Sequence, residues 1–188
     1  MRGFAHVVVC GGVLLGCGPL STHPLQPKSP TQVAQVQKLS PDDDAYAKFR
    51  AGRYPFETAL ANLQEARSIA KKLAGRAGGT AKGGFDDLTA HLDEMGRSLS
   101  EMTGELPSRE VFAARFPEFD EQRIKAISEG NRLLSIIEDS GAIAHDLAEG
   151  APASFKKEME RLSNLLDEVQ DGVESGIRES GGEVATEG

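Results

Sequence analysis

The sequence predicts an all-α protein, an antiparallel four-helix bundle with a short additional N-terminal helix. Apolar residues recur at spacings of three and four along several long segments, which is typical of helices that bury one face. No segment alternates apolar and polar residues as a half-buried strand would. Glycines and prolines divide the chain into segments joined by short connections, and short connections make neighbouring helices run antiparallel.

The first predicted helix is short. Ser40 offers a hydroxyl cap, Pro41 takes the first helical position, and the acidic residues that follow lie near the positive end of the helix dipole. We expect this helix to end near Gly52.

The next two predicted helices carry the clearest apolar seams. One begins around Pro55, and Gly78 and Gly79 separate it from the helix that follows. The seam of the first consists of Phe56, Ala59, Leu63, Ala66, Ala70, Leu73 and Ala77. The seam of the second consists of Phe85, Leu88, Leu92, Met95, Leu99, Met102 and Leu106. These heptad-like spacings predict helices that pack side by side.

Two more helices are predicted towards the C-terminus. Residues 104–117 are irregular, with one helical turn at 109–116, and a longer helix covers 118–149. Its face has doubled apolar positions and is wide enough to touch two neighbours. These positions are Leu133, Leu134, Ile136, Ile137 and Ile143. Gly150 and Pro152 then separate it from the last helix. The seam of that helix consists of Phe155, Met159, Leu162, Leu166, Val169, Val173 and Ile177.

Residues 1–16 predict a signal peptide. Arg2 gives a small positive region, and residues 4–15 form an apolar run too short for a bilayer, which needs roughly 20 apolar residues. The four residues Leu14-Leu15-Gly16-Cys17 resemble the lipobox of bacterial lipoproteins. The alternative interpretation is an ordinary secretory signal peptide in which Cys17 is coincidental.

The lipobox resemblance implies a membrane anchor. Cys17 would become the first mature residue and carry a diacylglyceryl thioether and an acylated amine, and three acyl chains make attachment effectively permanent. The resemblance implies attachment to the cell membrane or outer membrane of a bacterium, with the folded domain outside the cytoplasm. Gly18 after the cysteine favours the outer membrane, because some bacteria use Asp there to retain a lipoprotein in the inner membrane.

Composition predicts the domain organisation. Residues 17–40 comprise the lipidated cysteine and a Pro-rich linker without apolar periodicity, which we expect to be disordered. Residues 41–179 are the predicted helical bundle domain. Residues 180–188 are rich in Gly and Glu and are predicted to be a disordered tail.

The charge balance limits the choice of partners. The chain has 21 Lys and Arg against 29 Asp and Glu, a net charge of −8. An acidic protein is unsuited to nucleic acid and to anionic lipid, which both require a cationic surface. We therefore expect the lipid on Cys17 to be the membrane contact. With no Trp, two Tyr and eight Phe, we also expect a plain aliphatic core.

A few residues could hold a metal or a haem. His91 and His145 each share a helix face with two acidic residues, namely Asp87, Glu94, Glu138 and Glu149. Folding the predicted helices back on one another places His91 opposite residues 131–133, too far from His145 for shared ligation. Three methionines occupy seam positions, where they more often fill the core. These are Met95, Met102 and Met159. We predict no metal and no cofactor.

No catalytic site is predicted. Ser68 with Lys71 and Ser154 with Lys157 match Ser-x-x-Lys, but the motifs that accompany it in penicillin-binding enzymes are missing. The sequence therefore predicts a membrane-tethered lipoprotein with a non-catalytic helical interaction or structural module. The protein partner is unknown, and the wide apolar face of helix 118–149 leaves self-association open. The alternative function is a ligand carrier or electron-transfer protein that binds haem or metal within the bundle.

Overall fold

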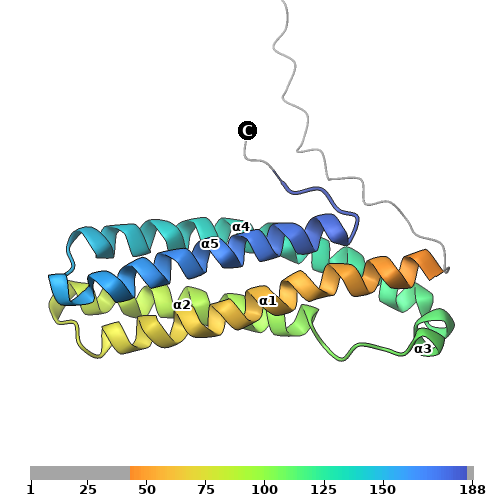
Figure 1. Cartoon of the computed structure of the whole chain (residues 1–188), viewed down its shortest axis with the longest axis horizontal. Helices are drawn as coiled ribbons and strands as arrows, with labels where there is room; N and C mark the ends of the chain where they lie inside the picture. The colour runs from red at the N-terminus through yellow and green to blue at the C-terminus, as the bar shows by residue number, and fades with distance from the viewer. Residues whose placement is uncertain (1–42, 186–188) are drawn as a thin grey trace, which may run out of the picture. The chain divides into compact units, whose positions relative to one another are not determined.

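The computed structural model describes residues 43–185, which form helices and loops with no strand among them (Figure 1). This confirms the predicted all-α class. The lipobox, the linker at 17–40 and residues 186–188 lie outside the described part.

Four long helices build the described part of the chain. They are α1 (Asp43–Ala74), α2 (Gly79–Met102), α4 (Phe116–Glu149) and α5 (Lys156–Glu179). The short helix α3 (Arg109–Ala114) lies between α2 and α4, and the 3₁₀ turn η1 (Ala153–Phe155) precedes α5. Helix α1 packs against α2 and α5, and α4 also packs against α2 and α5. One apolar core therefore receives side chains from all four long helices.

The predicted seams line this core. The seam residues are all buried within three ranges, from Phe56 to Leu73, from Phe85 to Leu99 and from Phe155 to Ile177. Ala77 and Met102 are half-buried. Leu106 is an exception, because α2 ends before it and its side chain is 40% exposed.

Helix α1 corrects the predicted start of the domain. The sequence predicts a short helix that ends near Gly52 and a second helix from about Pro55, whereas α1 runs continuously through both residues. A proline inside a helix removes one backbone hydrogen bond and usually costs about 3 kcal/mol. Here Phe56 is buried in the core, and Gly52 packs against Ser180 at the end of α5. This tertiary packing offsets the cost, so the predicted separate N-terminal helix does not exist.

Helix α4 contacts two neighbours, as its wide apolar face predicts. Leu133 and Ile137 are buried, while Leu134 and Ile136 are half-buried and pack against the edge of the core. The helix starts at Phe116, two residues earlier than predicted, with a proline in its first turn. The predicted helical turn before it corresponds to α3.

Residues 180–185 lie against α4. The guanidinium of Arg123 donates from Nη1 to the carbonyl of Ser180 at 2.7 Å, and the Asn131 side chain makes two hydrogen bonds to this segment, at 2.7 and 3.1 Å. Composition predicts disorder for 180–188, but polar side chains of α4 hold the part that the structure describes.

Ion pairs join the exposed sides of the long helices. Glu158 on α5 lies 3.0 Å from Nζ of Lys72, in the last turn of α1, and 2.6 Å from Nη1 of Arg76, in the turn that follows α1. Further pairs join α1 to α5 and α2 to α4, namely Glu65–Arg161 and Glu94–Arg132. None of the helices in the described part is both long and apolar enough to span a membrane.

Candidate functional site

The candidate site surrounds an extended segment that links α2 to α3. This segment, residues 103–108, is named the strap. Two side chains of α1 fasten its ends: Arg53 donates to the carbonyl of Thr103, and the Tyr46 hydroxyl donates to the carbonyl of Pro107 at 3.0 Å. A cavity lies on each side of the strap, and Arg53 and Leu106 line both of them.

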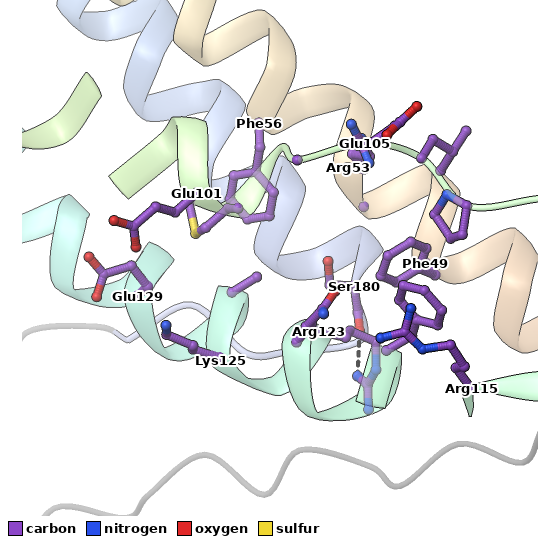
Figure 2. Close-up of a pocket in the computed structure, with 18 of the residues that line it drawn as sticks. Phe49, Arg53, Phe56, Glu101, Glu105, Arg115, Arg123, Lys125, Glu129 and Ser180 are labelled. Carbon is purple, nitrogen blue, oxygen red and sulfur yellow. Dashed lines mark hydrogen bonds between the residues drawn. The ribbon is translucent and has the colours of Figure 1, made fainter. Parts of the chain in front are cut away.

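The larger cavity has a volume of about 940 Å³ and lies between α1, the end of α2, the strap and the first half of α4 (Figure 2). Its apolar walls are formed mainly by Phe49, Phe56, Met102 and Phe119. Its lining includes both acidic and basic side chains. The volume falls within the range of small-molecule sites, roughly 300–1,000 Å³.

Charges in the larger cavity are unevenly distributed. Figure 2 shows Glu101 and Glu129 near one end and Arg115 near the other. The pKa of Glu129 is lowered from its ordinary 4.5, mainly by a hydrogen bond from Arg132. Glu118 is not part of the cavity lining, but it pairs with Arg115, whose hydrogen bond is the main cause that lowers the pKa of Glu118. Both carboxylates therefore stay charged at neutral pH.

Arg123 is buried beside this cavity and uses its donors inside the protein. It is 3% exposed, and its Nε and Nη2 atoms donate to Oδ1 of Asp120 at 2.9 and 2.7 Å. Nη1 donates to the carbonyl of Ser180. The residue therefore ties the start of α4 to the end of α5.

An aromatic cluster supports the same end of the protein. It is a second core that joins α1, α3 and α4, and it consists of Ala45, Tyr46, Phe49, Phe112, Phe116 and Phe119. The Phe112 ring lies 5.2 Å from that of Phe49 and 5.4 Å from that of Phe119, between centroids. Such pairs contribute about 0.5–1.5 kcal/mol each. The predicted plain aliphatic core is wrong here, and the helical spacing of Phe112, Phe116 and Phe119 could have revealed the cluster.

The smaller cavity is a groove of about 590 Å³ on the other side of the strap, which we name the arginine groove. Its lining consists of Tyr46, Ala47, Arg50, Ala51, Arg53, Tyr54, Glu57, Leu106 and Arg109. The two tyrosines are the only ones in the chain. Three arginines and one glutamate give the groove a local positive charge.

Exposed hydrophobic side chains gather around the strap. In residues 44–185 four large hydrophobic side chains are exposed: Tyr54, Leu106, Val111 and Ile124. Tyr54 is 71% exposed, and the first three of these residues line one or other cavity. Single exposed hydrophobics are normal, whereas a group beside concave surfaces indicates a binding region.

The histidines and methionines do not form a common ligand set. Nδ1 of His91 lies 3.4 Å from Oγ of Ser140, while His145 is 74% exposed and lies 3.6 Å from Glu149. Met95 and Met159 are buried in the apolar core. Across residues 43–185, no group of three or more His, Cys, Asp and Glu side chains could hold a metal ion.

The register of α2 against α4 differs from the prediction. The sequence places His91 opposite residues 131–133, but it lies opposite Ser140, and Arg132 instead reaches Glu94. The prediction was wrong because it folded one helix directly back on the other. The strap and α3 make the connection too long to fix the register.

The predicted lipidation site, Cys17, lies outside the described residues.

Comparison of the chain with known protein families, with curated proteins and with solved structures finds no match.

Proposed function

We propose that this protein is a bacterial cell-envelope lipoprotein, tethered to the cell membrane or outer membrane through lipids on Cys17. Its helical domain is a non-catalytic interaction or structural module. The lipobox-like residues 14–17, placed after a short apolar run, support the tether.

The gathering of exposed apolar residues beside two cavities carries the interaction role. Tyr54 and Leu106 are exposed next to several arginines, and Tyr and Arg are the residue types enriched among interface hot spots. Two arginines at this site form ion pairs with neighbouring glutamates: Arg53 lies 2.7 Å from Glu57, and Arg115 pairs with Glu118. Such a surface is suited to recognition of a binding partner rather than to catalysis.

The finer architecture belongs to the same proposal. We infer that α1, α2, α4 and α5 form an antiparallel four-helix bundle, because each packs against two of the others and short connections join α1 to α2 and α4 to α5. The bundle is then the rigid support on which the strap is fastened.

Replacement of Cys17 tests the tether. Cys17→Ala should abolish incorporation of labelled palmitate and release the domain from membranes, because the thiol that accepts the diacylglyceryl group is gone. Cys10→Ala is the matched control, since Cys10 lies in the signal segment and should be removed with it. A Cys17→Ala protein that still incorporates palmitate would contradict the proposal.

The larger cavity favours a second candidate function, which is ligand carriage or electron transfer. Its volume of about 940 Å³ and its aromatic walls suit a small amphipathic molecule, and haem or metal within the bundle is the related alternative. Native mass spectrometry of protein extracted from its own membranes separates the two functions. A mass increased only by acyl chains supports the interaction module, and further bound mass supports the carrier.

A further inference from the structure

The larger cavity combines buried aromatic rings with exposed carboxylates. Phe56 and Phe119 in its lining are only 2% and 7% exposed, whereas Glu101 and Glu105 are exposed. Glu101 belongs to the last turn of α2 and Glu105 to the strap. Figure 2 shows the Phe56 ring between these two acidic side chains in this view. A molecule in the cavity therefore meets apolar surface in the interior and carboxylates towards solvent.

The positive charges in the cavity lining are already compensated within the protein. Each of its three arginines has a carboxylate partner, and the pairs are Arg53–Glu57, Arg115–Glu118 and Arg123–Asp120. Glu129 pairs with Arg132, which also pairs with Glu94. The pKa of Glu129 is lowered mainly by the hydrogen bond from Arg132, and the nearby positive charge of Lys125 lowers it further. These last four side chains together carry no net charge.

Two carboxylates of the lining have no such partner. The side chains of Glu101 and Glu105 form no ion pair and no hydrogen bond with any described residue. They leave an excess of two negative charges beside the cavity. The carboxyl end of α2, which also borders the cavity, adds the negative end of a helix dipole. The cavity therefore attracts cations and repels anions.

Ser180 provides a second indication of a ligand site. It lines the cavity and is 4% exposed, and its carbonyl accepts the hydrogen bond from Arg123. Its hydroxyl, in contrast, forms no hydrogen bond with any described residue. Buried hydroxyls normally have a partner, so this group is available to a polar group of a bound molecule.

We propose that the larger cavity binds an amphipathic amine. The apolar body of the amine packs against Phe56 and Phe119, and its ammonium group lies near Glu101 and Glu105. This proposal rests on the ligand-carrier candidate described under the proposed function, whose ligand class it names. It does not depend on the lipid tether.

Three probes of nearly equal size test the charge of the ligand. Phenylbutylamine is cationic at pH 7, phenylbutanol is neutral and phenylbutyrate is anionic. The full-length protein in phosphatidylcholine nanodiscs is titrated with each probe by isothermal calorimetry, and the heats measured with empty nanodiscs are subtracted. The amine should bind saturably and most tightly, and phenylbutyrate should bind most weakly. Added salt should weaken binding of the amine but not of phenylbutanol.

Removal of the two carboxylates makes the test specific. A variant with both Glu101→Gln and Glu105→Gln should bind phenylbutylamine about three- to tenfold more weakly, because it loses two exposed charge interactions. Its affinity for phenylbutanol should not change. The matched control is Glu121→Gln with Glu138→Gln, which removes the same charge from exposed positions that line neither cavity. The control should bind the amine as the wild type does, and circular dichroism confirms that each variant is folded.

Two results would overturn the assignment of an amine and leave a ligand carrier: binding of phenylbutyrate as tight as that of phenylbutylamine, or equal affinity of the Glu101→Gln, Glu105→Gln variant and the wild type for the amine. No binding of any probe would contradict both the amine and the carrier. Failure of the protein to enter nanodiscs would contradict only the lipid tether. The titration then proceeds with the protein in solution.

Discussion

Gly52 lies where α1 meets the end of α5. A Cβ atom at this position would lie 2.9 Å from the backbone N of Ser180, a separation that real Cβ atoms essentially never show, and 3.0 Å from its Cα, which is tighter than nine in ten real Cβ contacts. Backbone atoms cannot rotate away as the end of a side chain can. The absence of a side chain at Gly52 therefore allows α1 to approach the segment that follows α5.

Gly52→Ala should lower the free energy of unfolding by about 1–3 kcal/mol, the usual cost of overpacking. Gly83→Ala is the control, because a Cβ there meets no atom within 4 Å and alanine favours a helix over glycine by up to about 1 kcal/mol. Urea denaturation compares the two variants. Equal or higher stability of Gly52→Ala would show that the contact is not tight.

Arg123 and Asp120 form a buried ion pair, and the two partners should not contribute additively. Arg123→Ala leaves the Asp120 carboxylate buried without its charge partner, so we expect a loss of about 3–5 kcal/mol. A double variant, Asp120→Asn with Arg123→Met, removes both charges and should be more stable than Arg123→Ala. Denaturation midpoints measure both, and a double variant that is less stable than Arg123→Ala would contradict this account.

The strap is the element whose position depends most on single contacts. One hydrogen bond from Arg53 and one from Tyr46 fasten it to α1. Arg53→Ala should increase amide hydrogen exchange within residues 103–108 severalfold, because the segment opens locally more often when it loses the hydrogen bond from Arg53. Arg97→Ala should leave this exchange unchanged, since Arg97 is exposed on α2 and lines neither cavity. Unchanged exchange in Arg53→Ala would show that other contacts hold the strap.

Local sequence patterns predicted which segments are helical, but they did not predict where one helix continues into the next. The seam from Phe85 to Leu99 is visible because its periodicity lies within one segment. The continuity of α1 through Pro55 depends instead on packing of Gly52 against Ser180, which is far along the chain. No local pattern contains that contact, so the short first helix was wrongly predicted.

The candidate site was not predicted for a similar reason. The arginine groove combines α1 residues such as Arg50 with Leu106 of the strap and Arg109 of α3. Each of these residues looks like an ordinary surface residue in its own segment. The lipobox at Cys17 is a local motif, so the sequence suffices to predict it, and it stays a prediction.

At the scale of the whole molecule, acidic side chains contribute to stability through ion pairs between helices. The pKa of Glu158 is lowered from its ordinary 4.5 by hydrogen bonds from Lys72 and Arg76, and the pKa of Glu65 is lowered mainly by a hydrogen bond from Arg161. A carboxylate with a lower pKa in the folded state stabilises the protein above its unfolded pKa. This contribution is lost as the pH falls through the folded value.

The melting temperature should therefore fall as the pH drops below about 4.5. Glu158→Gln should melt at a lower temperature than the wild type at pH 7, and the difference should shrink at low pH because the wild-type carboxyl is then protonated as well. Glu121→Gln is the control, since Glu121 is exposed and forms no ion pair with any described residue. Thermal unfolding from pH 7 to pH 3 measures these differences. If the difference in melting temperature between Glu158→Gln and the wild type does not change with pH, ion pairing of the Glu158 carboxylate is not its cause.

The tether and the helical module together define the proposed protein, and the mass of the native chain tests the tether most directly. Protein extracted in detergent from bacterial membranes is measured by intact mass spectrometry. The account predicts the mass of residues 17–188 plus a diacylglyceryl group and one further acyl chain. A mass that corresponds to residues 1–188 without lipid, or to a mature chain with an unmodified cysteine, would contradict it.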